Sequence, residues 1–575
     1  MQSPWRHLIP ALALCCALPA IAAREFTPQA GLWMIPSENN GQPGRGFSLD
    51  VQGNTAFLQV FNYEKSGAAT FHTAVGQLDD AAAMTVPLLR FKGGRFLGGP
   101  AQDAVEDGTA GNVTVKFTDG LNGTVQFPGE SEQAIARFLV NEKQPFWWTQ
   151  LSDDPPSGKE GSRLMRWTAT TQSGTRYVWI ATLGTDAGGV FPLGLESPFD
   201  WGSAVRRFDC RMQAATQVFD CLPTANSTNP EAPNLPLEAQ RLRFRVVGRD
   251  VVGEIQPAWD PAQRMTLTGW NDGSFSCNAS WCNDASVRSA RIYASFRPFE
   301  DVCITGYCTG YGYGHITLLP SSGAWMIVDE NTGRPGRGVF LDVQEDSVIV
   351  QTSDYLESGE PTFHMGAGTL KSSKSISEDT TSSFPLVRYA GGRFFGGPAQ
   401  SGKEVIDAGS LQLAISSEFP SDTLTDFASG RITLPGEATQ SIHRLSLEPA
   451  AATGIDHMLG EYWVEWQMKQ PIRREMHWLR LSKVDGLIAK NDDGTIQCRQ
   501  RDATYRYRMT CFWNDKPNVT LDNMSDLKGY VDVDVNPFNR SGGNDSPSLL
   551  YTRDRHGNWL GLGAVKLPGL AIPAQ

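Results

Sequence analysis

The chain contains the same sequence block twice. Residues 31–72 align without a gap on residues 323–364, and 22 of the 42 positions are identical. A second block, residues 87–102, matches residues 385–400 at 12 of 16 positions, and the offset between the copies grows from 292 to 298. This change indicates insertions or deletions between matched segments, as loops between fixed elements allow. We therefore expect two copies of one structural unit.

Each copy has the pattern of a β meander. Short runs of β-branched and aromatic residues recur about every ten residues and are bounded by Gly, Asn, Asp or Pro, which is typical of strands and turns. In the first copy we predict eight strands, at residues 31–35, 46–52, 56–63, 70–78, 85–91, 113–117, 123–127 and 134–140. Eight short sequential strands favour an up-and-down barrel or a two-sheet sandwich, because closure or stacking removes exposed edges.

A further β-rich stretch that carries the cysteines follows each copy. We therefore predict an all-β fold, a tandem duplication of antiparallel meander barrels or sandwiches in the order A-B-A′-B′. The predicted modules are A at residues 24–140, B at 141–311, A′ at 312–446 and B′ at 447–575.

Residues 1–23 have the pattern of a cleavable secretory signal. Arg6 provides a basic start, residues 8–18 form an apolar run, and Ala20-Ile21-Ala22 close the segment with small residues. No other segment approaches the roughly 20 apolar residues that a membrane-spanning helix needs. We expect an extracytoplasmic protein, periplasmic or secreted, without a transmembrane segment.

Cysteine usage agrees with this compartment. Of the ten cysteines, two lie in the signal segment, and the remaining eight predict four disulfides in an oxidising environment. Cys210 with Cys221 and Cys498 with Cys511 occupy similar places after each repeat block, so we expect each pair to bridge locally. Cys277, Cys282, Cys303 and Cys308 form two C-x4-C segments that bridge locally or cross-link neighbouring strands. A zinc site is the alternative, but structural zinc usually shows tighter spacing. We predict no metal and no cofactor.

The charge balance excludes two classes of partner. The formal net charge is −12 and no run of Lys or Arg occurs. Nucleic acid and anionic membrane surfaces both require a basic patch, so we expect neither as a partner.

The residues kept in both copies are of two kinds. Apolar strand residues are expected in the core: Trp33/Trp325, Leu49/Leu341, Val51/Val343 and Phe71/Phe363. The polar ones alternate with them and meet either solvent or a pocket. Our candidate binding residues are Asp50, Gln52, His72, Arg95, Asp342, Gln344, His364 and Arg393. Arg95 and Arg393 lie in glycine-rich loops that form either tight turns or a nest for an anion.

The usual catalytic patterns are missing from the sequence. It contains no G-x-S-x-G nucleophile elbow and no H-x-x-x-H or H-E-x-x-H zinc spacing. Sixteen tryptophans raise the alternative of sugar stacking, against burial in the core. Those of the B modules are Trp147, Trp148, Trp201, Trp463, Trp466 and Trp513.

One motif resembles a known group of proteins. The run G-x-W-x-x-P followed by G-x-G-F, seen at Trp33, Pro36 and Phe47, and a later Y-x-x-x-G resemble a module of uncharacterised secreted proteins of proteobacteria. The hairpin Trp of that module is replaced here by Phe71 and Phe363. The resemblance covers the two A modules and implies an all-β extracytoplasmic module, without a catalytic residue or a ligand.

Three functional hypotheses follow. The leading one is a secreted or periplasmic non-enzymatic binding protein whose ligand is a polysaccharide or another cell-envelope component. The second is a secreted hydrolase with a site between modules, formed by Asp50, His72 and Arg95 or their partners. The third is a scaffold that recruits an envelope protein through a sheet edge.

Overall fold

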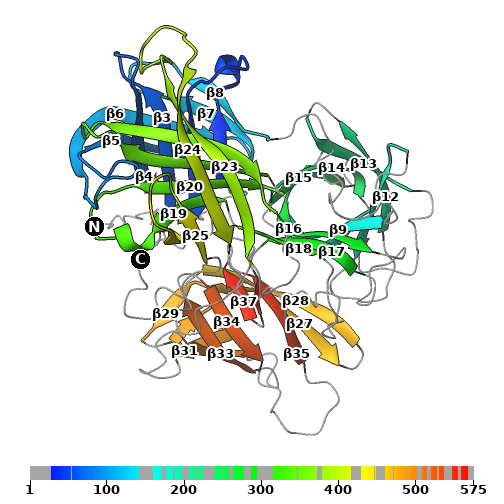
Figure 1. Cartoon of the computed structure of the whole chain (residues 1–575). Coiled ribbons are helices and arrows are strands. Elements are labelled where there is room, and N and C mark those ends of the chain that lie inside the picture. The colour runs from blue at the N-terminus through cyan, green and yellow to red at the C-terminus, as the bar shows by residue number, and fades with distance from the viewer. Residues whose placement is uncertain are drawn as a thin grey trace, which may run out of the picture.

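The computed structural model describes residues 28–140 except 53, 54 and 80, and residues 315–447 except 321, 346, 372–378, 416–428 and 446. Within 160–293 and 460–566 it describes chiefly the strands named below. The predicted all-β fold is confirmed, and the helical elements of this part are the short 3-10 helices η1 (Pro36–Glu38) and η3 (Val328–Glu330). Figure 1 shows two adjoining barrels in blue and green, a third body in teal and a fourth in orange to red.

The first barrel is an eight-stranded antiparallel meander. It is closed because β1 pairs with both β2 and β8. Its strands are β1 (Gly31–Met34), β2 (Gly46–Gln52), β3 (Thr55–Tyr63), β4 (Ala69–Gln77), β5 (Ala83–Lys92), β6 (Val105–Phe117), β7 (Asn122–Gln126) and β8 (Gln133–Arg137).

The second barrel repeats this order and closes through β19 and β26. Its strands are β19 (Gly323–Ile327), β20 (Gly338–Gln344), β21 (Ser347–Tyr355), β22 (Pro361–Thr369), β23 (Thr380–Ala390), β24 (Lys403–Ile415), β25 (Ser429–Thr433) and β26 (Gln440–Arg444). The strand register is also repeated: Leu49 faces Leu58 in the first barrel, and Leu341 faces Val350 in the second. The two sequence copies therefore fold alike, as closed barrels rather than sandwiches.

Inward-facing residues fill both barrels. Trp33, Leu49 and Val51 lie in the core of the first barrel, as predicted, and their counterparts lie in the core of the second. Phe71 and Phe363 are also buried, but they belong to a separate aromatic cluster rather than to either barrel core. Because strand residues alternate between faces, the outward face of β4 and β22 must be covered by something else.

One predicted strand is longer than expected. We predicted a strand at residues 113–117, whereas β6 begins at Val105, and its counterpart β24 begins at Lys403. The added part pairs with β5 beyond the point where β7 stops. Gly108 and Gly111 have positive φ there, and such glycines resemble a loop in sequence although they form bulges in this ribbon.

A third barrel lies between the two copies in sequence. β16 pairs with both β15 and β9, which closes eight antiparallel strands. They are β9 (Glu160–Thr170), β10 (Arg176–Leu183), β11 (Phe191–Glu196), β12 (Arg206–Gln213), β13 (Val218–Pro223), β14 (Ala239–Val247), β15 (Asp250–Pro257) and β16 (Met265–Cys277). β17 (Val287–Tyr293) and the parallel β18 (His315–Leu319) extend this sheet toward β19.

The C-terminal sheet follows a similar path. β27 pairs with β28, and only Ser482 separates β28 from β29. From β29 the strands pair in sequence order as far as β34, which pairs with β37, and β37 pairs with β27. Its strands are β27 (Gly460–Lys469), β28 (Ile472–Leu481), β29 (Lys483–Asp485), β30 (Ile488–Lys490), β31 (Ile496–Gln500), β32 (Arg508–Trp513), β33 (Thr520–Leu527), β34 (Tyr530–Val535), β35 (Pro547–Arg553), β36 (Trp559–Gly561) and β37 (Gly563–Lys566).

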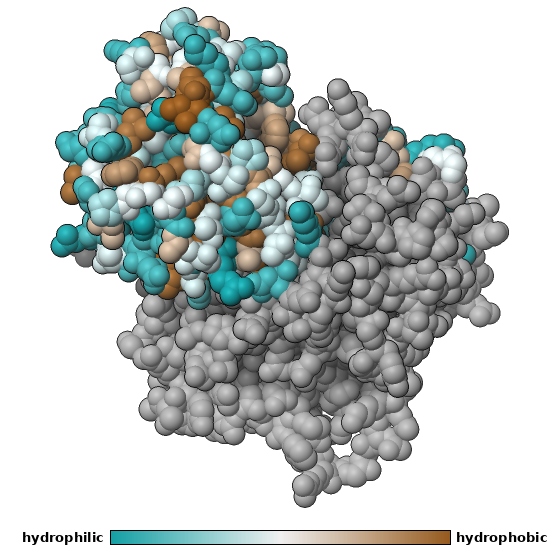
Figure 2. All heavy atoms as spheres, in the orientation of Figure 1, coloured by the Kyte–Doolittle hydropathy of each residue, from teal (hydrophilic) through white to brown (hydrophobic). Residues whose placement is uncertain are grey.

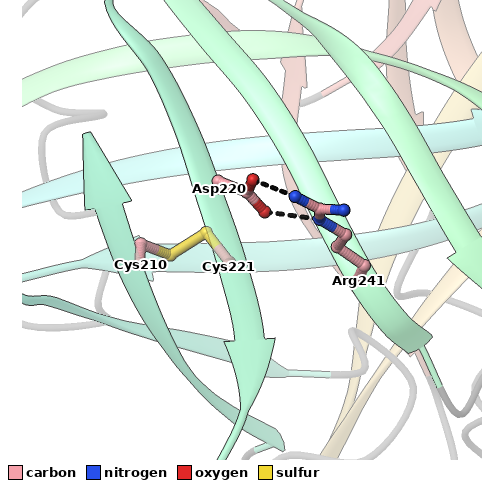
Figure 3. The surroundings of a disulfide bond; sticks show 4 residues. All are labelled: Cys210, Asp220, Cys221 and Arg241. Atoms are coloured by element: carbon pink, nitrogen blue, oxygen red, sulfur yellow. Dashed lines mark hydrogen bonds and ion pairs between the residues drawn. A yellow bond between two sulfur atoms is a disulfide. The ribbon is translucent and has the colours of Figure 1, made fainter. Parts of the chain in front are cut away.

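One predicted disulfide is present in the third barrel. Cys210 on β12 and Cys221 on β13 are directly opposite and bonded, beside an ion pair between Asp220 and Arg241 (Figure 3). In the C-terminal sheet Cys498 is disulfide-bonded and faces Cys511 across the ladder.

Several predictions fall outside the described residues. These are the signal segment, Cys282, Cys303 and Cys308, residues Trp147, Trp148 and Trp201, and the side chains of Cys277, Trp463, Trp466 and Trp513. Among the described residues, no helix has the length and apolar character needed to cross a membrane.

Candidate functional site

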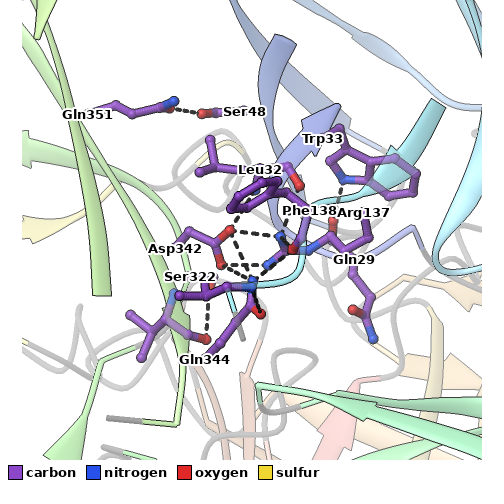
Figure 4. Close-up of polar contacts among 12 residues, drawn as sticks. Gln29, Leu32, Trp33, Ser48, Arg137, Phe138, Ser322, Asp342, Gln344 and Gln351 are labelled. Atoms are coloured by element: carbon purple, nitrogen blue, oxygen red, sulfur yellow. Dashed lines mark hydrogen bonds and ion pairs between the residues drawn. The ribbon is translucent and has the colours of Figure 1, made fainter. Parts of the chain in front are cut away.

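Most of the predicted binding residues lie where the two barrels meet. Asp342 on β20 of the second barrel forms a two-pronged ion pair with Arg137 at the end of β8 (Figure 4). The Arg137 Nη2 to Asp342 Oδ1 distance is 2.5 Å, and the two side chains are 2% and 1% exposed. The N–H of Leu32 donates to the same carboxylate at 2.9 Å. The carboxylate of Asp342 thus accepts hydrogen bonds from a side chain and from a backbone N–H of the first barrel.

Asp50 makes the same contacts in the opposite direction. Its carboxylate pairs with Arg444 at the end of β26, with Arg444 Nη2 2.7 Å from Asp50 Oδ1. The N–H of Ala324 donates to Asp50 at 3.2 Å. Removing one partner of a buried ion pair leaves an uncompensated charge and strongly destabilises the structure, so both pairs favour the arrangement in which the two barrels meet.

Of the two predicted glutamines, only Gln344 has a side chain that the structure describes. Gln344 donates to the backbone oxygen of Phe138 at 2.9 Å and accepts from the N–H of Val140 at 3.1 Å. These bonds tie the second barrel to the segment that leaves the first. Gln52 ends β2 at the equivalent position, but its side chain lies outside the described residues.

Arg393 joins a cluster of two arginines and two glutamates. It lies 2.6 Å from Glu38 and 3.3 Å from Glu130, both in the first barrel. Arg45 sits between the same two carboxylates, at 2.6 Å from each. Burial alone would raise the pKa of Glu130, but the hydrogen bonds from Arg45 and from the Gly396 N–H lower it overall. Each arginine of the cluster therefore contacts both glutamates.

Arg95 belongs to the twin cluster. It lies 2.7 Å from Glu330 and 3.1 Å from Glu437, with Arg337 between these carboxylates. The Gly98 N–H donates to Glu437 at 2.9 Å. Arg95 and the Gly98 N–H of this glycine-rich loop thus both contact a carboxylate of the other barrel.

The loops that carry these arginines close against the opposite barrel. The Gly391 N–H donates to the Gly67 oxygen at 2.7 Å, and a Cβ placed on Gly392 would lie 2.0 Å from the ring of Tyr63. The twin loop repeats both contacts, with Gly93 bonded to Gly359 at 2.8 Å and Gly94 against Tyr355. Glycine is required at these positions because the aromatic ring occupies the space of a side chain.

Next to these loops an aromatic cluster fills the junction. Phe61 and Phe363 meet edge to face at 4.9 Å between ring centroids, and Phe71 contacts Tyr355 at 5.9 Å. These rings come from both barrels, which explains why Phe71 and Phe363 are buried outside the barrel cores.

His72 lies inside the mouth of the first barrel. The ring of Phe395, from the second barrel, covers it at 5.2 Å and also contacts Phe127 at 5.2 Å. Burial, followed by repulsion from Arg90, lowers the pKa of His72 to about 4. Leu97 packs in the same way against the core of the second barrel.

His364 has a different neighbour from its twin. Its Nδ1 lies 3.1 Å from Asp354, whereas the residue equivalent to Asp354 in the first barrel is Asn62. Burial raises the pKa of Asp354, against the lowering effect of His364. Both side chains are buried, with His364 7% and Asp354 0% exposed.

The polar candidates whose side chains the structure describes therefore make contacts in several separate parts of the junction. Asp50 is engaged by Arg444, Arg95 by the glutamates and His72 by apolar neighbours, each in a separate part of the junction. Within the part of the chain that the structure describes, no group of three His, Cys, Asp or Glu could hold a metal ion. A ligand-binding role for the eight residues stays a prediction.

Sequence reasoning missed the partners of these residues. They are Arg137 and Arg444, Glu130 and Glu437, Glu38 and Glu330, and Arg45 and Arg337. Each is the same residue type in both copies. Pairing opposite charges among the twice-kept residues would have pointed to a contact between the copies.

Comparison with known proteins adds no relative: no protein-family model matches the chain, and no curated protein matches its sequence.

Proposed function

We propose that this chain is a non-enzymatic binding protein that works outside the cytoplasm, with a polysaccharide or another cell-envelope component as its ligand. The observation that carries the proposal is the use made of the twice-kept polar groups. These groups form the ion pairs that join the two barrels: Asp50, Asp342, Arg95 and Arg393. The interiors of both barrels are filled with apolar side chains. In this proposal the two joined barrels act as one body. Because their interiors and their junction are filled with side chains, the ligand contacts their outer surface.

The outer surface of the barrel pair offers apolar contact points. On the face shown in Figure 2, hydrophobic spots are scattered among hydrophilic side chains. Among the described residues of the pair, the large exposed hydrophobic ones are Val75, Val105, Val405 and Ile406. In this proposal the exposed apolar side chains contact the ring faces of a glycan, and the polar side chains around them contact its hydroxyl groups.

The test is retention of the full-length mature protein on immobilised polysaccharides and on cell-envelope fractions. Saturable retention without release of fragments supports binding. Release of reducing ends that stops in His72→Gln supports the hydrolase instead, because that reading assigns His72 a catalytic role. Absence of retention on every matrix would count against the proposal.

A specific observation favours the scaffold as second candidate. β6 pairs with β7 only from Thr114, and residues 105–109 of β6 are exposed one after another, which leaves one edge of the β5–β6 ribbon without a strand partner among the described residues. Such an edge can accept an added strand, although the bulge at Gly108 shortens it. Capture of an envelope protein that Val105→Asp abolishes would support this role. Val75→Asp is the matched control, since Val75 and Val105 are 54% and 55% exposed.

A further inference from the structure

The contacts between the two barrels are reciprocal. Five of the contacts between the barrels occur twice, because the twin residues make the same contact in the opposite direction. The pairs of contacts are Arg137–Asp342 with Arg444–Asp50, Glu38–Arg393 with Glu330–Arg95, Gly67–Gly391 with Gly359–Gly93, Pro43–Gly402 with Pro335–Ala104, and Tyr63–Gly392 with Tyr355–Gly94.

Reciprocal contacts are the mark of an isologous interface, in which one surface patch meets its own copy. Such a patch must carry both halves of every contact. The first barrel does so: Asp50 and Arg137 are the two sides of the ion pair, and Tyr63 and Gly94 are the two sides of the ring contact. Nothing in these polar contacts requires that the opposite barrel be the second one.

We infer that this surface is self-complementary, so that a first barrel whose partner is withheld pairs with the first barrel of a second copy of the chain. Within one chain the two barrels are tethered, which raises their effective concentration and makes the internal pair the normal state. The surface is thus an intermolecular interface that the tether keeps occupied.

Two of the junction positions that differ between the barrels favour the internal pair. Ser48 of the first barrel is hydrogen-bonded to Gln351 of the second. The twin of Ser48 in the second barrel is the bulky Phe340. Phe61 of the first barrel contacts Phe363 of the second. The twin of Phe61 in the second barrel is the small Ser353. Each barrel has one large and one small residue, in exchanged places, so pairing of like barrels is expected to be weaker than the internal pair.

The test blocks the second barrel only, in the full-length chain. Asp342→Arg faces Arg137 with a like charge, and Gly392→Trp meets the ring of Tyr63. The first barrel keeps its native surface in this double variant. Light scattering should show a two-fold increase in mass relative to the wild-type chain, with dissociation on dilution.

A cross-link checks the geometry of the new pair. Ala68 forms a bridge with Ala390, whose twin in the first barrel is Lys92. Ala68→Cys with Lys92→Cys should therefore link two chains in the blocked variant and should link none in an otherwise wild-type chain. The mirror variant, Asp50→Arg with Gly94→Trp, tests the second barrel in the same way.

Folded, monomeric behaviour of both blocked variants at all concentrations overturns the inference. Unfolding of the unblocked barrel in both variants also overturns it, because a barrel that cannot persist without its partner has no surface to offer a second chain. Dimers that do not cross-link through the two cysteines would show a different interface and reject this one.

Discussion

Asp342 and Arg137 lie in different barrels and form an almost completely buried ion pair. In such a pair the loss of one partner leaves an uncompensated charge, which costs about 3 to 5 kcal/mol. The pair therefore acts as a selective contact: it stabilises only the arrangement in which both groups meet. The same holds for Asp50 and Arg444 on the other side of the junction.

We expect Asp342→Asn to lower the free energy of unfolding by about 3 kcal/mol or more, because Arg137 stays buried without its counter-charge. Urea unfolding followed by tryptophan fluorescence measures this. Asp107→Asn removes an exposed ion pair with Lys92 and serves as the control, with no measurable change expected. If both substitutions changed the free energy of unfolding equally, the buried pair would contribute no more to stability than the exposed one.

Gly392→Ala should destabilise the junction through a steric clash. The added methyl would lie 2.0 Å from the ring of Tyr63, so either the loop or the ring must move. We expect a cost of about 1 to 3 kcal/mol and faster proteolysis of the 391–400 loop. Gly44→Ala is the control, because its nearest neighbour, the Glu38 oxygen, would be 3.7 Å away. Gly392→Ala with wild-type stability would refute the tight packing.

His72 should make the protein less stable in mild acid. Its pKa is lowered from 6.5 to about 4, so the unfolded chain binds the proton more readily than the folded one. Stability is then lost as the pH falls from about 6.5 toward 4, by up to about 3 kcal/mol for this one group. His72→Gln should remove this part of the pH dependence whatever it does to stability at neutral pH. Unfolding curves at about pH 7 and pH 4.5 compare the two proteins.

Asp354 should have the opposite pH dependence. Burial raises its pKa above 3.8, so ionisation is harder in the folded state and stability falls as the pH rises above that value. Asp354→Asn introduces the residue type of Asn62, its twin in the first barrel. The stability of the variant relative to wild type should increase between acid and neutral pH. A difference that stays constant across this range would contradict the assignment.

The sequence allowed the barrel interior to be predicted but not the junction. Trp33, Leu49 and their twins have the alternation of half-buried strands, which is a local signal. Asp50 and Arg95 were recognised as polar positions kept twice, but the partners lie in the other copy, so no local pattern could show that they meet. The start of β6 was missed because Gly108 and Gly111 look like a turn.

Phe395 closes the mouth of the first barrel, and Leu97 that of the second. Because Phe395 lies between β23 and β24, this end of the first barrel stays uncovered until that part of the chain has been synthesised. The strands β1 to β8 close the barrel by themselves, so only the covering of its end depends on the second copy. A chain that stops before Phe395 would therefore leave the inward-facing His72 without its aromatic cover.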